Sequence, residues 1–229
     1  MLPAAWVIPL PKNYPLVKGA QFSNIISACD ILEMSSLESG QWLALSAGNS
    51  TVAAIVLQFA RRKGIRTLAI VRRARSDFDL RSIGAEVVLE THTLEKDLHE
   101  TVRDITEGRS IDSIIDCVGG PNLAHLIRCA SRGAQVIIYG GFSSEQFSLH
   151  NFDLLLKVLD IRSYAYRYFF DPPAPEDLPQ LWALAEQTAG EDFKVPEGGL
   201  YSLDDFRLAV QGTLERPEQG KRFFAMSDG

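Results

Sequence analysis

A cluster of small and polar residues, Ser46 to Thr51, lies between a short apolar run, Trp42 to Leu45, and a segment with helical periodicity. Apolar side chains recur at i, i+3, i+4 and i+7 from Val52 to Phe59, which predicts one buried face of an α-helix. The first turn of a helix presents unpaired backbone N–H groups, and these attract anions. A strand, a tight turn and a helix in this order are therefore suited to holding a phosphate group.

The turn does not carry a strict G-x-G-x-x-G pattern. Small residues recur instead at Ala47, Ser50 and Ala53, a looser form of the same spacing. Parallel sheets also contain crossovers of this kind that bind nothing. Taken alone, the turn leaves a purely structural crossover and a phosphate site equally open.

Three arginines follow the next apolar run, Thr67 to Val71. In a dinucleotide-binding fold the residue that ends the second strand meets the adenosine ribose, where an acid accepts the 2′-hydroxyl of NAD and an arginine suits a 2′-phosphate. Arg72 holds that place, and Arg73 and Arg75 lie beside it. Together with the preceding turn they favour NADP, although a solvated basic turn is the simpler alternative.

Two further strands end in glycine pairs, Cys117-Val118-Gly119-Gly120 and Tyr139-Gly140-Gly141. Glycines at the carboxyl ends of neighbouring strands let a flat ligand approach the backbone, and open α/β sheets bind their ligands at this edge. The alternative is that these glycines only form turns.

Strands alternate with helices along most of the chain, which predicts a mostly parallel sheet with right-handed crossovers. We expect strands at 42–45, 67–71, 87–89, 111–118, 134–139, 160–170 and 221–225, and helices within 16–37, 52–63, 94–107, 122–129, 151–158, 181–187 and 206–214. Tyr164, Tyr166, Tyr168 and Phe170 would alternate onto one side of the long strand 160–170.

The resulting fold class is α/β, a Rossmann-type doubly wound parallel sheet with strand order 3-2-1-4-5-6. We divide the chain into an N-terminal arm and helix, 1–39, a nucleotide-binding domain, 40–170, and C-terminal helices with a last strand, 171–229. Four prolines between residues 3 and 15 favour extended backbone in the arm.

Composition excludes several classes of protein. The 229 residues are 46% apolar and 23% charged, which is ordinary for a globular chain. The net charge of −6 and the pI near 5.3 argue against nucleic-acid binding. No run of about 18 apolar residues is present, and Met1 to Ile8 is too short and too poor in positive charge for a signal peptide, so we expect a cytoplasmic protein with no membrane partner.

The cysteines Cys29, Cys117 and Cys129 are odd in number and scattered, and the four histidines do not cluster. Neither a disulfide framework nor a structural zinc site is indicated. We therefore predict no metal site.

Taken in order, several motifs resemble the medium-chain dehydrogenase/reductase superfamily, in its zinc-independent branch of enoyl-thioester reductases and quinone oxidoreductases. The resemblance spans nearly the whole chain. It rests on 6–11, 24–28, Gly40-Gln41-Trp42, Ala47-Gly48-Asn49-Ser50-Thr51-Val52, Ile83-Gly84-Ala85-Glu86, Asp116-Cys117-Val118-Gly119-Gly120, Tyr139-Gly140-Gly141 and Gly220-Lys221.

The resemblance implies an NADP(H) site. Asn49, Ser50, Thr51 and Val52 would hold the pyrophosphate, and Arg72, Arg73 and Arg75 the 2′-phosphate. Cys117, Val118, Gly119 and Gly120, with Tyr139, Gly140 and Gly141, would line the nicotinamide side. Two departures are evident: Ala53 stands where the family usually has glycine, and the chain begins after the family's separate GroES-like catalytic domain.

Two hypotheses follow. The first is an NADPH-dependent reductase, or the cofactor-binding portion of one, acting on an enoyl thioester, quinone or enone. It would form a homodimer through strand 160–170 and work with a separate GroES-like domain, and no catalytic residue can be assigned. The second is a non-catalytic nucleotide-binding or scaffold protein derived from such a reductase.

Overall fold

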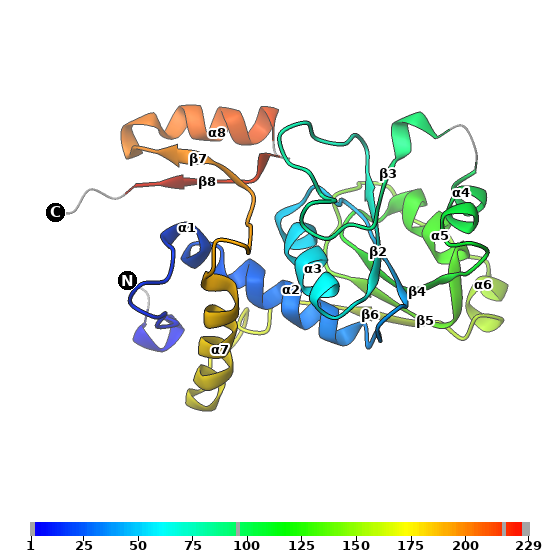
Figure 1. Cartoon of the computed structure of the whole chain (residues 1–229), viewed down its shortest axis with the longest axis horizontal. Helices are drawn as coiled ribbons and strands as arrows, with labels where there is room; N and C mark the ends of the chain where they lie inside the picture. Colours follow the sequence, from blue (N-terminus) through cyan, green and yellow to red (C-terminus); the bar gives the residue numbers. More distant parts are fainter. Residues whose placement is uncertain (1–2, 95–96, 217–218, 226–229) are drawn as a thin grey trace.

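Six parallel strands form the central sheet, in the order β3-β2-β1-β4-β5-β6, which confirms the predicted Rossmann-type topology (Figure 1). The computed structural model describes residues 3–94, 97–216 and 219–225. The strands are β1 Trp42–Leu45, β2 Arg66–Val71, β3 Val87–Glu90, β4 Ile111–Asp116, β5 Ala130–Ile138 and β6 Asp160–Ser163. Each pair is in parallel register, for example Leu43 with Thr67 and with Ser113.

Helices cover both faces of this sheet because alternate side chains of each strand point to opposite faces. Helices α2 (Phe22–Met34) and α3 (Thr51–Arg62) pack on the face that carries Leu43 and Leu45. On the other face, α4 (Leu98–Ile105) and α5 (Gly120–Arg128) pack against Trp42 and Ala44. The two layers bury separate apolar cores, as a doubly wound sheet requires.

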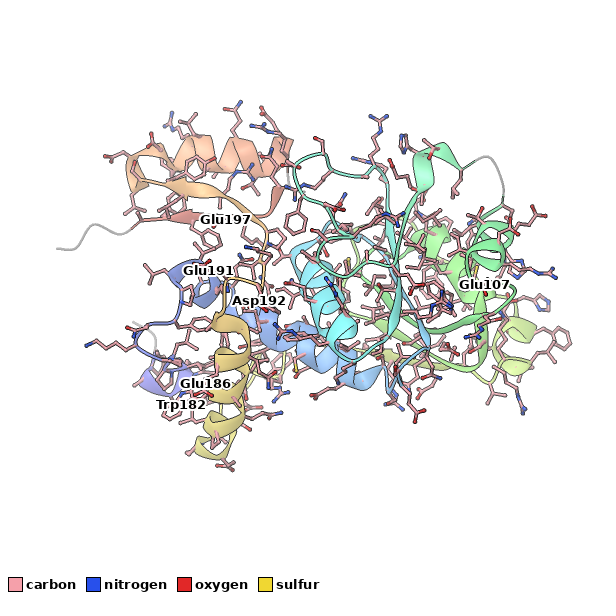
Figure 2. The ribbon with its side chains drawn as sticks, in the orientation of Figure 1. Glu107, Trp182, Glu186, Glu191, Asp192 and Glu197 are labelled. Carbon is pink, nitrogen blue, oxygen red and sulfur yellow. The ribbon has the colours of Figure 1, made fainter. Side chains whose placement is uncertain are left out.

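The N-terminal arm lies against α7 (Leu178–Ala189) and not against the sheet (Figure 1). It contains η1 (Ala4–Trp6) and α1 (Leu16–Gly19). The Trp182 indole donates to the carbonyl of Pro9 at 2.7 Å, and Figure 2 shows Trp182 on the arm side of α7. Lys18 Nζ donates to the carbonyls of Thr188 and Ala189 at 2.9 and 3.1 Å, and so caps the C-terminus of α7.

Lys157 caps the C-terminus of α5. Its ammonium group donates to the carbonyls of Ile127 and Ala130 at 3.2 and 2.8 Å, where the helix ends and β5 begins. Lysine at a helix C-terminus satisfies orphan carbonyls and complements the dipole. The chain thus ends two helices with lysines that are distant in sequence.

A small second sheet follows α7 and was not fully predicted. Strand β7 (Glu197–Tyr201) pairs in parallel with β8 (Lys221–Phe224), and α8 (Phe206–Glu215) connects them after η4 (Leu203–Asp205). The sequence predicted only the last strand, because the glycines at 198 and 199 weaken the strand pattern of β7. The remaining short elements are η2 (Thr91–Thr93), α6 (Asn151–Leu155) and η3 (Pro175–Asp177).

The predicted long aromatic strand at 160–170 is wrong. Strand β6 ends at Ser163, and the chain then leaves the sheet edge. Tyr164 and Tyr166 are partly buried against the α2–α3 core, and Tyr168 is buried within it. These tyrosines therefore contribute to the core rather than to an exposed sheet edge.

Asp30 on α2 holds this segment in place. Its carboxylate is 7% exposed and accepts hydrogen bonds from Arg167 Nε and the Tyr164 hydroxyl, each at 2.9 Å, and Arg167 Nη2 forms a further ion pair with it. Burial, together with the Asp30 carboxylate beside it, raises the pKa of the Tyr164 phenol. These contacts bind the segment after β6 to α2 instead of to the sheet edge, and Asp30 and Arg167 are 137 residues apart in sequence.

No helix among the described residues is both long and apolar enough to cross a lipid bilayer.

We predict that Asp30→Ala lowers the free energy of unfolding by about 1.5 to 3 kcal/mol, because the partly exposed Arg167 guanidinium and the Tyr164 hydroxyl both lose a charged acceptor. The matched control is Asp192→Ala, which removes a carboxylate that is 78% exposed and pairs with Arg62; it should cost less than about 1 kcal/mol. Urea unfolding followed by circular dichroism measures both. Similar costs for the two variants would show that Asp30 does not anchor the segment.

Candidate functional site

The turn between β1 and α3 is packed tightly against the end of β2. Ala47 adopts a positive φ of 47°, and the Gly48 amide donates to the carbonyl of Ile70 at 2.8 Å. A Cβ at Gly48 would lie 3.0 Å from both the Ala69 Cβ and the Val71 Cγ1. Only glycine fits this close approach without displacing β2.

Ser50 begins α3 as its N-cap, and its hydroxyl accepts from the Ala53 amide at 3.2 Å. The amides of Thr51 and Val52, also in the first turn, have no assigned acceptor within the described part of the chain. Asn49 Oδ1 is buried and likewise has no hydrogen-bond partner among the described residues. The turn therefore offers backbone donors and one side-chain acceptor to a ligand.

The arginine loop after β2 is hydrogen-bonded to this turn. Asn49 Nδ2 donates to the carbonyl of Arg73 at 2.9 Å, which joins the two segments directly. Glu90, at the end of β3, accepts from the Ala74 amide at 3.0 Å. Arg72 and Arg73 are both exposed, so the structure places two of the three predicted arginines at the surface beside the turn.

Arg75 differs from the other two. Its Nε and Nη2 donate to the two carboxylate oxygens of Asp77, each at 2.9 Å, and its guanidinium lies 5.2 Å from the centre of the Phe78 ring. The side chain is only 9% exposed. Sequence reasoning gave Arg75 the same role as its neighbours, whereas the structure shows it already paired.

The ends of β4 and β5 form the other half of the edge. Asp116 is fully buried; its Oδ2 accepts from the Gly119 amide at 2.7 Å, while its Oδ1 has no partner among the described residues. The Ser46 hydroxyl, at the end of β1, accepts from the Cys117 amide at 3.0 Å. Neighbouring strand ends are thus joined across the sheet.

Tyr139 follows β5, and its amide donates to the carbonyl of Asp116 at 2.9 Å. Burial raises the pKa of its phenol well above the ordinary value, and the adjacent Cys117 adds to the rise, while a hydrogen bond with Ser50 opposes it. These neighbours place the phenol between the β4 end and the N-terminus of α3. Burial likewise raises the pKa of the Cys117 thiol, so this cysteine is a poor nucleophile.

The glycines at this edge serve different purposes. A Cβ at Gly140 would lie 3.1 Å from the Cβ and carbonyl of Cys117, so close strand packing requires that glycine. By contrast, a Cβ at Gly119 or Gly141 would meet nothing within 4 Å. Gly119 also has a positive φ of 73° and forms the N-cap of α5. Open space therefore faces two of the predicted glycines, as an approaching ligand requires.

Sequence reasoning assigned no site role to four residues of this edge, although two of them lie within its motifs: Ser46, Asp77, Glu90 and Asp116. Asp77 could have been found from its position two residues after Arg75. Ser46 and Glu90 act through hydrogen bonds to other segments, which the sequence does not show, whereas Asp116 accepts from the Gly119 amide only three residues away. The predicted residues otherwise gather at one edge, and their roles toward a ligand stay predictions.

The described residues contain no group of three or more His, Cys, Asp or Glu side chains arranged to hold a metal ion. Cys29, Cys117 and Cys129 are all free thiols.

A family model described as zinc-binding dehydrogenase matches residues 51–187, which is more than half of the chain. The chain belongs to the zinc-binding dehydrogenase family. The match begins at the first residue of α3 and ends within α7, so it includes the arginine loop and the ends of β4 and β5. The predicted superfamily is thereby confirmed.

The relatives include the mitochondrial enoyl-[acyl-carrier-protein] reductase of Homo sapiens, which is 24% identical over 96% of this chain and 60% of its own length. A solved structure of a Bacillus thuringiensis NADPH:quinone reductase matches with a TM-score of 0.81 and 23% identity, over 96% of this chain and 66% of that one. The Etr1p complex with NADP and crotonyl-CoA matches with a TM-score of 0.73 and 19% identity, over 93% and 62%. This zinc-binding dehydrogenase chain spans between 45% and 60% of the length of the first curated relatives it matches.

Proposed function

We propose that the chain is the cofactor-binding part of an NADPH-dependent reductase that acts on an activated C=C or carbonyl group. The observation that carries this proposal is the hydrogen bond from Asn49 to the carbonyl of Arg73. It places a turn with open backbone donors next to a loop with exposed arginines. The relatives named as enoyl reductases and the NADP complex of Etr1p support the same cofactor and substrate class.

The residues present suit NADP(H). Open amides at Thr51 and Val52 match the negative charge of a pyrophosphate, and exposed guanidinium groups at Arg72 and Arg73 match a 2′-phosphate. Asn49 Oδ1 is a buried acceptor without a partner in the described chain, and a ribose hydroxyl is a donor that would satisfy it. The open sides of Gly119 and Gly141 leave room for a flat ring at the β4 and β5 ends.

The cofactor, when bound, would supply hydride to the substrate. The chain's own residues would orient and enclose it. Gly48 and Asn49 hold the β1–α3 turn against β2 and the loop that follows it. The Cys117 amide binds the end of β1, and the Tyr139 amide binds the end of β4. We assign no proton donor among the described residues at the carboxyl ends of the strands.

We further propose that the small sheet of β7 and β8 docks a second, GroES-like domain that completes the substrate pocket. A two-stranded sheet is marginal on its own and leaves two open edges. Its connecting helix α8 exposes Phe206, Val210 and Leu214 at i, i+4 and i+8, and Leu214 is 77% exposed. Such a surface suits a permanent domain contact.

The open edge of β6 supports the predicted homodimer. The strand available for pairing has four residues, Asp160–Ser163, instead of the eleven predicted at 160–170. Unpaired backbone groups along an edge strand pair readily with a second copy. The chain that leads into and through β6 also exposes apolar side chains: Phe152, Leu155, Leu156, Val158 and Ile161. The cytoplasmic location stays a prediction.

We predict that the chain binds NADPH at least about tenfold more tightly than NADH, because charge-assisted contacts are worth about 1.5 to 3 kcal/mol. The preference should shrink in Arg72→Ala and persist in Arg132→Ala, which removes an exposed arginine at the start of β5. Nucleotide fluorescence titration measures the affinities of both nucleotides for each chain. Equal affinities for the two nucleotides would contradict the NADP assignment.

We predict slow or undetectable reduction of crotonyl thioesters, quinones and enones by the chain alone, and faster reduction by a fusion with a GroES-like domain. Well-oriented binding can supply about 7 to 11 kcal/mol of a barrier, and much of the substrate wall would come from the second domain. NADPH oxidation followed by absorbance measures the rates. No turnover by either form, with NADPH still bound, would favour the non-catalytic alternative; turnover by the chain alone at about 1 to 1,000 per second would contradict the need for a second domain.

We predict that light scattering at micromolar concentration gives twice the mass of one chain. Ile161→Lys places a charge on the β6 edge and should yield a monomer, whereas Leu214→Lys, which changes an equally apolar exposed residue on α8, should leave the dimer intact. A monomeric wild-type chain would rule out this interface.

A further inference from the structure

Arg75 and Asp77 form a closed local ion pair in the loop after β2. The guanidinium donates through Nε and Nη2 to both carboxylate oxygens, each at 2.9 Å, in the bidentate geometry that arginine also uses for phosphate. Phe78 stacks on the same guanidinium. A carboxylate thus occupies the donors with which Arg75 would bind a phosphate.

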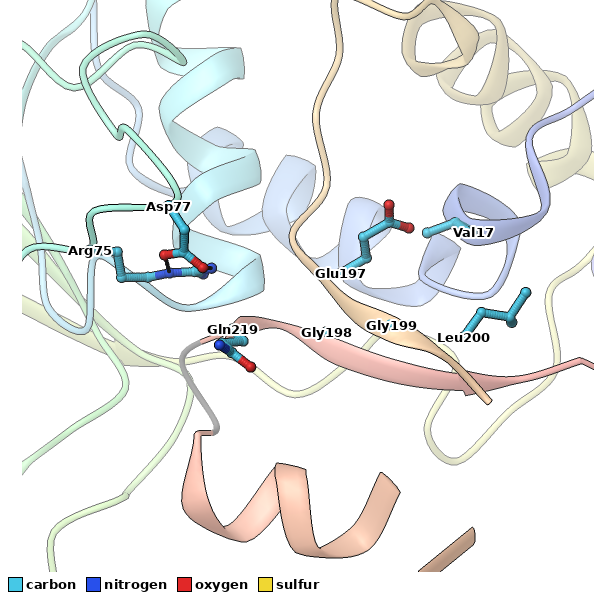
Figure 3. A pocket seen from close by; sticks show the side chains of 8 residues that line it. All are labelled: Val17, Arg75, Asp77, Glu197, Gly198, Gly199, Leu200 and Gln219. Carbon is cyan, nitrogen blue, oxygen red and sulfur yellow. Dashed lines mark hydrogen bonds and ion pairs between the residues drawn. The ribbon is translucent and has the colours of Figure 1, made fainter. Parts of the chain in front are cut away.

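The pair lines an open cavity of about 550 Å³ (Figure 3). Glu197 and Leu200 of β7, with Gln219 before β8, form the facing wall. The loop that carries the pair is hydrogen-bonded to the β1–α3 turn, since Asn49 Nδ2 donates to the carbonyl of Arg73, two residues before Arg75. The cavity therefore shares Arg75 with the loop that would receive the adenosine end of the cofactor.

The two partners are unequally free to move. The Arg75 side chain is 9% exposed and held by Phe78, whereas the Asp77 side chain is 56% exposed. Hydrogen bonds from Arg75 hold the pKa of Asp77 below its ordinary value, so the carboxylate is charged at neutral pH. Because Asp77 faces solvent, water can hydrate its carboxylate once it leaves Arg75, while Arg75 would remain at the cavity wall.

We propose that Asp77 competes with the 2′-phosphate of the cofactor for Arg75 and thereby limits how strongly the chain prefers NADPH to NADH. This inference rests on the proposed function. While the pair is closed its net charge is zero, so Arg75 adds little attraction for an incoming phosphate. When the phosphate displaces Asp77, Arg75 exchanges one bidentate partner for another. Within the described part of the chain, the exposed Arg72 and Arg73 have no carboxylate partner of this kind.

The test compares the affinities of NADPH and NADH for the wild-type chain and for Asp77→Asn, measured by nucleotide fluorescence titration. Asparagine at this position would keep the side-chain size and lose the charge. We expect Asp77→Asn to bind NADPH about three to ten times more tightly, with NADH changed by less than about twofold. The effect should be greatest at low salt, because the competition is between charges.

Two controls separate this competition from general charge effects. Asp79→Asn removes the same charge two residues away, from a carboxylate that accepts only the Arg81 amide at 2.9 Å among the described residues, and asparagine can keep that hydrogen bond. It should change the NADPH affinity by less than about twofold. In the Arg75→Gln background, Asp77→Asn should no longer strengthen NADPH binding, because the contested donor is gone.

The failures of this test are distinguishable. If the wild-type chain binds neither nucleotide, the proposed function and this inference both fail. If it binds NADPH but Asp77→Asn binds it no better, Asp77 does not compete. Weaker NADPH binding by Asp77→Asn would show that Asp77 orients Arg75 for the phosphate. Equal gains in NADPH affinity from Asp77→Asn and Asp79→Asn would show only a long-range charge effect. Each of the last three outcomes overturns the Asp77 proposal and leaves the proposed function standing.

Discussion

The close approach of the β1–α3 turn to β2 is the constraint on which the whole carboxyl edge depends. Gly48 lets the turn backbone lie against Ala69 and Val71 and donate to Ile70. Because the turn is fixed to β2, the loop that follows β2 lies within reach of Asn49. The first turn of α3 and the arginine loop therefore form one surface, although the hydrogen bond that joins them spans 24 residues of sequence.

Much of the fold could be predicted from the sequence because local signals agree with the global arrangement. Buried parallel strands read as continuous apolar runs, such as Leu43 to Leu45, and the alternation with helices fixes the topology. The end of β6 could not be predicted, because the alternating tyrosines after Ser163 match a strand pattern equally well. Tyr164 and Arg167 bind Asp30, which belongs to a helix far away in sequence.

The residues of the candidate site also fall into those that the sequence could predict and those that it could not. Residues that act through backbone geometry, such as Gly48 and Gly119, lie within motifs that glycine itself marks. Side chains that act through one another do not show in a pattern: the Ser46 hydroxyl accepts from the Cys117 amide on a neighbouring strand, and Asp77 pairs with Arg75. A count of arginines thus overstated the positive charge available at the end of β2.

Lys18 and Tyr14 join the N-terminal arm to the end of α7. The Lys18 ammonium group satisfies the last carbonyls of α7, and Tyr14 of the same arm hydrogen-bonds Thr188 at 2.8 Å. Opening the arm would expose these buried polar groups together with the end of α7. Amide protons in the arm and in the last turn of α7 should therefore exchange with solvent in one cooperative event, which makes two segments at opposite ends of the sequence a single unit of local unfolding.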